Sequence, residues 1–81
     1  MKADYLVEMV NDIGAFFTSE AGLKEAPKGV ADHIARFWDP RMRREIIAHY
    51  QASGGTGLSD VSLKAIALLA QQAALASSGA R

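Results

Sequence analysis

The segment Phe37-Trp38-Asp39-Pro40-Arg41-Met42-Arg43-Arg44 contains the strongest helix-breaking signal in this chain of 81 residues. A residue that precedes proline is disfavoured in the α region, so a helix that reaches Trp38 is expected to stop there. Asp39 is a good N-cap, and Pro40 suits the first position of a new helix. The sequence therefore predicts two helices that meet at a sharp bend at Asp39-Pro40.

Helical patterns continue on both sides of this bend. Upstream, apolar residues share one face over residues 3–18 and again in a helix that begins near Pro27, with a loop predicted over residues 19–28. Downstream, a third helix runs to the glycine-rich segment 53–57, whose glycines are expected to end it. A fourth helix follows, with Ser59 as its predicted N-cap.

These patterns define the fold class. No segment shows a strand pattern, so the predicted class is all-α, a small bundle of about four short helices. A chain of 81 residues is the size of one domain. We expect this single helical domain to cover residues 1–76 and to be followed by a frayed C-terminal tail, residues 77–81.

The predicted fourth helix is apolar around nearly its whole circumference. Its large apolar residues are Val61, Leu63, Ile66, Leu68, Leu69 and Leu75. A helix of this kind is usually buried on more than one side. Four short helices in so small a chain cannot bury it completely, so we expect part of it to face another chain.

Composition limits the partners and the location of the protein. Nine basic and nine acidic side chains give a formal net charge of zero, so we expect no nucleic-acid partner. The first eight residues place carboxylates where a signal peptide needs its apolar stretch. The longest uncharged run, residues 65–80, is too short and too polar to span a bilayer. These features predict a cytoplasmic protein without a membrane segment.

No residue pattern predicts catalysis or cofactor binding by this chain. There is no cysteine, which excludes thiolate-bound zinc and iron–sulfur clusters, and the two histidines, His33 and His49, are too far apart in sequence to suggest a metal site. Glu8 and Asp12 share a helix face but lack the Glu-x-x-His companion of carboxylate-bridged metal bundles. The glycines of segment 54–57 follow a helix and lack the ending of a phosphate-binding loop. The predicted protein is therefore noncatalytic and free of metal and cofactors.

The bend itself is the best candidate for function. Tryptophan and arginine are enriched in the residues that dominate binding at protein interfaces, and Arg43 projects from an otherwise apolar helix face. The alternative is an elbow that packs only its own core, with the aliphatic stem of Arg43 reaching out to water. We favour the docking interpretation, with the segment from Trp38 to Arg43 and the apolar fourth helix as contact surfaces.

Two motifs connect the chain to a known family. The more distinctive is His33-x-x-x-Phe37-Trp38-Asp39-Pro40-Arg41-Met42-Arg43, and the second is Met9-Val10-Asn11-Asp12-Ile13-Gly14-x-Phe16-Phe17. On these motifs, between about Leu6 and about Leu69, the chain resembles the delta subunit of soluble NAD-dependent, molybdenum-containing formate dehydrogenases. Val10 stands where this family would suggest alanine, and the alanine-rich end extends beyond the similar part.

The resemblance implies a noncatalytic accessory subunit of a cytoplasmic complex. Other subunits of that complex would carry out the oxidation of formate by NAD, the large one holding bis-molybdopterin guanine dinucleotide and iron–sulfur clusters, and others holding FMN and further clusters. The delta chain would bind no cofactor and would support assembly or stability of the enzyme, docking on the large catalytic subunit. By the same resemblance, the contact residues would be Phe37, Trp38, Arg41 and Arg43.

Two other functions fit parts of the sequence. A transient assembly chaperone of the same enzyme would differ from a permanent subunit only in its stoichiometry in the mature complex. A small helical regulator could contact nucleic acid through the arginines around the bend, as helix-turn-helix modules do, but zero net charge argues against it.

Overall fold

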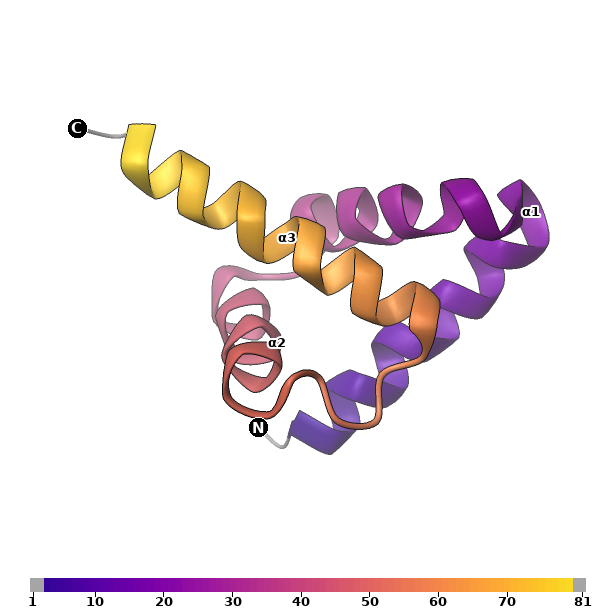
Figure 1. Ribbon diagram of the computed structural model, residues 1–81, viewed down its shortest axis with the longest axis horizontal. Helices are drawn as coiled ribbons and strands as arrows, with labels where there is room; N and C mark the ends of the chain where they lie inside the picture. The colour runs from indigo at the N-terminus through magenta and orange to yellow at the C-terminus, as the bar shows by residue number, and fades with distance from the viewer. Residues whose placement is uncertain (1–2, 80–81) are drawn as a thin grey trace.

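The computed structural model describes residues 3–79, which form three α-helices and no strand (Figure 1). Helix α1 spans Ala3–Phe37, α2 spans Pro40–Ser53 and α3 spans Asp60–Gly79. The all-α class is confirmed. The expected number of about four helices is wrong by one, because the two predicted upstream helices form a single bent helix.

A single glycine produces the bend in α1. Gly22 has φ 86° and ψ 164°, a conformation that is strained for any residue with a Cβ, whereas the neighbouring residues stay helical. The loop predicted over residues 19–28 is therefore wrong, since most of its residues are good helix formers and one glycine is enough to redirect the chain. Pro27 lies near the start of the redirected helix, where proline disturbs few hydrogen bonds. We call residues 3–21 the first arm of α1 and residues 23–37 its second arm, and Figure 1 shows them diverging from the bend.

The predicted helix ends downstream of α1 are confirmed. The Asp39 carboxylate accepts a hydrogen bond of 3.0 Å from the Met42 N–H and caps α2, with Pro40 at its first position. Gly54 ends α2 in the left-handed region and donates its N–H to the Tyr50 carbonyl at 2.8 Å. The Ser59 hydroxyl accepts from the Ser62 N–H at 3.3 Å and caps α3.

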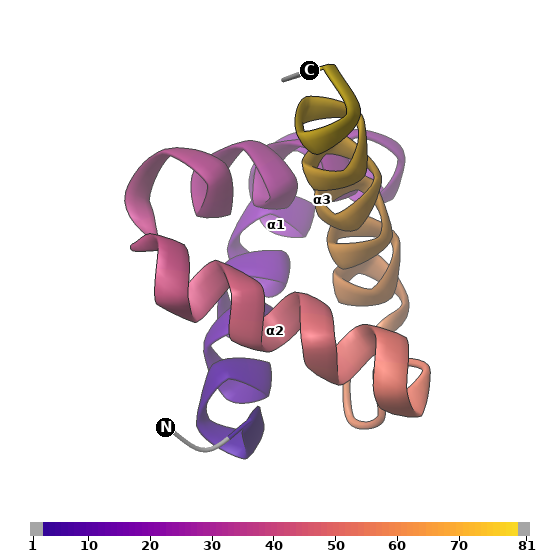
Figure 2. The same ribbon diagram turned by 90° about the vertical axis from the view of Figure 1, so that its left-hand side faces the viewer.

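Helix α3 packs against α1 and α2, and the core lies between the three helices. Figure 2, in which α2 faces the viewer, shows α2 crossing in front of the first arm and α3. The buried apolar side chains of this core include Leu6, Val10, Val30, Ile34, Trp38, Ile46, Ile66 and Leu69. These residues come from every helix, so the bend in α1 and the bend before α2 are both needed to close the core.

The fold buries more of α3 than the sequence suggested. Because both arms of α1 and α2 surround it, its apolar residues up to Leu69 are buried or half-buried. Residues 71–76, which include Leu75, are exposed, and Figure 1 shows the C-terminal end of α3 extending beyond the other helices. Neither α3 nor any other helix in residues 3–79 is long and apolar enough to cross a membrane.

The predicted frayed tail, residues 77–81, is only partly described by the structure. The backbone of residues 77–79 still belongs to α3, and Ala80 and Arg81 lie outside the described residues. Fraying of this tail stays a prediction.

Asn11 fastens the loop between α2 and α3 to the first arm of α1. Its Nδ2 donates to the Gly57 carbonyl at 3.0 Å, and its Oδ1 accepts from the Ser59 N–H at 3.0 Å. The two contacts use the donor and the acceptor of the amide, and both join residues more than 45 positions apart. Asn11 therefore holds the start of α3 in register with α1.

Replacing Asn11 with alanine is expected to lower the free energy of unfolding by about 1–2 kcal/mol, because two hydrogen bonds are lost together. Urea denaturation followed by circular dichroism measures this change, and amide exchange at Ser59 should accelerate in parallel. Gln71→Ala is the control, since Gln71 is exposed on α3 and is expected to change stability by less than about 0.5 kcal/mol. Equal effects of the two substitutions would show that Asn11 does not fasten the loop.

Candidate docking surface

Trp38 is part of the hydrophobic core. Trp38 is 6% exposed and belongs to the same buried cluster as Ile34 and Ile46. Its backbone N–H donates to the Ile34 carbonyl at 3.1 Å. Trp38 therefore fixes the angle between α1 and α2. Its indole offers almost no surface to a second protein.

Phe37, which directly precedes Trp38, is 71% exposed. Its ring lies 5.0 Å, centroid to centroid, from the imidazole of His33. The row continues from His33 to Phe17 at 6.2 Å and from Phe17 to Phe16 at 5.3 Å. These four rings connect the two arms of α1, and the rings at both ends of the row, Phe16 and Phe37, are largely exposed.

Arg43 is half-buried and is occupied by its own chain. Its Nη1 donates to the Trp38 carbonyl and, at 3.4 Å, to the Ala35 carbonyl. Carbonyls at the end of a helix have no partner within the helix, and a cation is favoured there. Arg43 therefore caps the C-terminal end of α1 from α2, which explains why an arginine projects from an apolar face.

Arg41 and Arg44 are the exposed cations of the bend. They line a hollow of about 480 Å³ together with Asp39 and Pro40. Within residues 3–79 the one ion pair joins Arg36 to Asp32, at 3.3 Å, so no carboxylate of the described chain neutralises Arg41 or Arg44. We call the exposed residues of the bend, Phe37, Asp39, Pro40, Arg41 and Arg44, the elbow surface.

The structure thus divides the four residues that the resemblance implied as contacts. Phe37 and Arg41 are exposed on the elbow surface, whereas Trp38 and Arg43 hold the bend together from inside. Arg44 was not among the expected contacts, although its spacing of three from Arg41 puts both on neighbouring positions of a helix.

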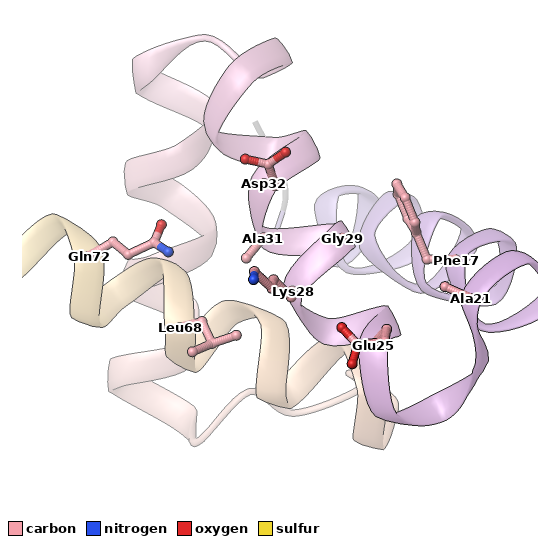
Figure 3. A pocket seen from close by; sticks show the side chains of 9 residues that line it. All are labelled: Phe17, Ala21, Glu25, Lys28, Gly29, Ala31, Asp32, Leu68 and Gln72. Carbon is pink, nitrogen blue, oxygen red and sulfur yellow. The ribbon is translucent and has the colours of Figure 1, made fainter.

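A groove of about 420 Å³ lies between the two arms of α1 and α3 (Figure 3). Phe17 and Ala21 come from the first arm, Leu68 and Gln72 from α3, and the remaining lining residues are Glu25, Lys28, Gly29, Ala31 and Asp32. Its charged side chains are of both signs and make no hydrogen bond with one another. Asp32 is instead paired with Arg36, so the charged side chains of the groove form no polar network with one another.

The histidines have structural surroundings. His33 lies in the aromatic row, and the Nε2 of His49 is hydrogen-bonded to the Thr56 carbonyl at 2.8 Å. In the part of the chain that the structure describes, no three His, Asp or Glu side chains are grouped so as to hold a metal ion. Neither histidine lies in a metal-ligand constellation.

The comparisons with known proteins identify the family. No curated protein and no solved structure matches the chain significantly. The family model described as "NADH-dependant formate dehydrogenase delta subunit FdsD" matches residues 5–66, which is about three-quarters of the chain. The match includes both sequence motifs, the whole bend between α1 and α2, and the buried first part of α3. The chain therefore belongs to the family of delta subunits of NAD-dependent formate dehydrogenase.

Proposed function

We propose that this chain is a noncatalytic subunit that docks on the large catalytic subunit of formate dehydrogenase and supports assembly or stability of the active complex. The observation that carries the proposal is the elbow surface, where the large ring of Phe37 is exposed and where Arg41 and Arg44 have no carboxylate partner in the described chain. Aromatic and arginine side chains supply much of the binding energy in protein interfaces. The family gives the complex in which such an interface would form.

The noncatalytic part of this proposal is supported by how the hydroxyl side chains are used. Ser59 and Ser62 bond to each other at the cap of α3, at 3.0 Å between their hydroxyl oxygens. Ser53 donates to the His49 carbonyl at 2.8 Å and accepts from the Thr56 N–H. In the described residues no serine hydroxyl is hydrogen-bonded to a histidine ring, which a serine nucleophile would require.

Cofactors are proposed to lie in the other subunits. Bis-molybdopterin guanine dinucleotide, iron–sulfur clusters and FMN would be held there, and formate oxidation and NAD reduction would take place there. The absence of cysteine means that this chain cannot supply thiolate ligands to an iron–sulfur cluster. Its contribution to activity would then be indirect, through the amount of correctly assembled enzyme.

Replacing Phe37 with alanine is expected to weaken binding to the large subunit by roughly tenfold or more, as loss of an exposed aromatic anchor does. The tagged chain is purified from its source cells, and the eluate is analysed by mass spectrometry, metal content and formate-dependent NAD reduction. Leu23→Ala is a matched control, because Leu23 is 70% exposed but lies beside the bend of α1, away from the elbow surface.

The outcomes separate the candidate functions. Stoichiometric recovery of a formate-oxidising complex by the wild-type chain and by Leu23→Ala, with poor recovery by Phe37→Ala, supports the proposal. Recovery of the large subunit only before its cofactor is inserted would instead identify an assembly chaperone. Recovery of the wild-type chain alone, or with nucleic acid, would contradict the subunit function.

A further inference from the structure

The arginines of the bend fall into two groups. Arg36 pairs with Asp32, and Arg43 is bonded to the carbonyls at the end of α1. Arg41 and Arg44 have no carboxylate partner within residues 3–79. The acids nearest to them in sequence are Asp39, which accepts the Met42 N–H as the cap of α2, and Glu45, which makes no ion pair within residues 3–79. Of the four arginines at the bend, Arg36 and Arg43 have partners within the described residues, whereas Arg41 and Arg44 have no such partner.

These two arginines do not serve the stability of α2. Arg41 lies in the first turn of the helix and Arg44 directly after it, and the first turn contains no acidic residue. The N-terminal end of a helix carries partial positive charge, so cations there are unfavourable. A residue that opposes the local preference of its own helix without a compensating contact points to a role outside the fold.

The spacing of the two side chains defines what they can bind. Residues three apart are neighbours on a helix surface, and Arg41 and Arg44 both line the hollow of about 480 Å³ beside Asp39 and Pro40. A guanidinium group has a planar fork of donors that matches a carboxylate or a phosphate with two parallel hydrogen bonds. The hollow is lined by only four residues, so it can receive side chains from the surface of a partner protein.

We propose that Arg41 and Arg44 bind a pair of neighbouring carboxylates on the surface of a partner protein. Given the function proposed above, on which this assignment of the partner rests, the carboxylates belong to the large catalytic subunit. Nucleic acid is disfavoured as the occupant, because tight binding to it needs many phosphate contacts and an excess of positive charge. This chain has zero formal net charge and only two unpaired arginines at the bend.

Charge reversal tests this proposal without harming the fold. The double variant Arg41→Glu/Arg44→Glu places acids at the start of α2, where the helix dipole favours them and offsets the new like-charge pair with Glu45, so the chain should stay folded. The matched control is Lys24→Glu/Lys64→Glu, in which two exposed lysines elsewhere are reversed and the formal charge changes equally. Circular dichroism confirms that both variants are folded before binding is measured.

The expected result is a dissociation constant for the large subunit that rises by about tenfold or more at low ionic strength for the arginine variant. The control should change it by less than about twofold. Binding of the wild-type chain should weaken as salt is added, and this salt dependence should nearly disappear in the arginine variant. Equal behaviour of the two double variants would overturn the proposal while leaving the subunit function intact.

A second measurement decides the proposal even when the subunit function fails. If the wild-type chain does not bind the large subunit, the isotope-labelled chain is titrated with a polyglutamate peptide and, separately, with a DNA duplex. Shifts of the Arg41 and Arg44 signals with the peptide, and weaker ones with DNA, support a carboxylate site. Stronger binding of DNA, or no shift with either probe, overturns it.

Discussion

Replacing Trp38 with alanine is expected to lower the free energy of unfolding by about 3–5 kcal/mol, the usual effect of removing a large buried aromatic side chain. Trp38 is 6% exposed and packs in the cluster that joins the end of α1 to α2. A core of this size contributes only about 3–5 kcal/mol of net stability. We therefore expect the Trp38→Ala variant to be largely unfolded. Urea denaturation followed by far-ultraviolet circular dichroism measures the loss without relying on tryptophan fluorescence.

The neighbouring aromatic residue is the control for this experiment. Phe37 is 71% exposed, so Phe37→Ala is expected to change stability by less than about 0.5 kcal/mol although it also removes an aromatic ring. The pair thus separates folding from docking, since Trp38 affects the first and Phe37 the second. A Trp38→Ala chain that folded stably but no longer bound the large subunit would contradict this division.

The ends of the helices could be predicted because local chemistry determines them. Asp39 precedes a proline and caps the next helix, Gly54 takes a left-handed conformation, and Ser59 caps α3, all through contacts within a few residues. The conformation around the bend in α1 was harder to predict, because a glycine and a proline five residues apart, Gly22 and Pro27, are typical of a loop. Whether the chain stays helical around Gly22 depends on packing of the two arms, which is not encoded in a short window of sequence.

The direction of each side chain at the bend could not be predicted from the pattern. Phe37 and Trp38 are consecutive aromatic residues, and which of them enters the core depends on the angle at which α2 leaves α1. The same holds for Arg43, whose partners are carbonyls of the preceding helix. Composition drew attention to the bend as a candidate site, but only the tertiary contacts separate the residues that build the bend from those that remain exposed.

Replacing Gly55 with alanine is expected to lower the free energy of unfolding by about 2–4 kcal/mol, through strain in the backbone and overpacking together. Gly55 has φ 85°, and a Cβ added there would overlap Cδ2 of Leu63 and lie 3.1 Å from Cδ1 of Leu58. Gly54→Ala is the matched control, because Gly54 has φ 75° but its Cβ would meet nothing within 4 Å. Its cost is expected to be only the strain of the left-handed backbone, about 1–2 kcal/mol.

The difference between the two variants isolates the packing of the loop against α3. Leu58 and Leu63 both lie against Gly55, on either side of the cap at Ser59, so this contact fixes where α3 begins. The double variant Gly55→Ala/Leu63→Ala removes the Leu63 methyl group that the new Cβ would overlap, and its loss should therefore be smaller than the sum of the two single losses. Equal stability of Gly54→Ala and Gly55→Ala in urea denaturation would mean that Leu63 moves aside at no cost. In that case the start of α3 would be held mainly by Asn11, through its bonds to Gly57 and Ser59.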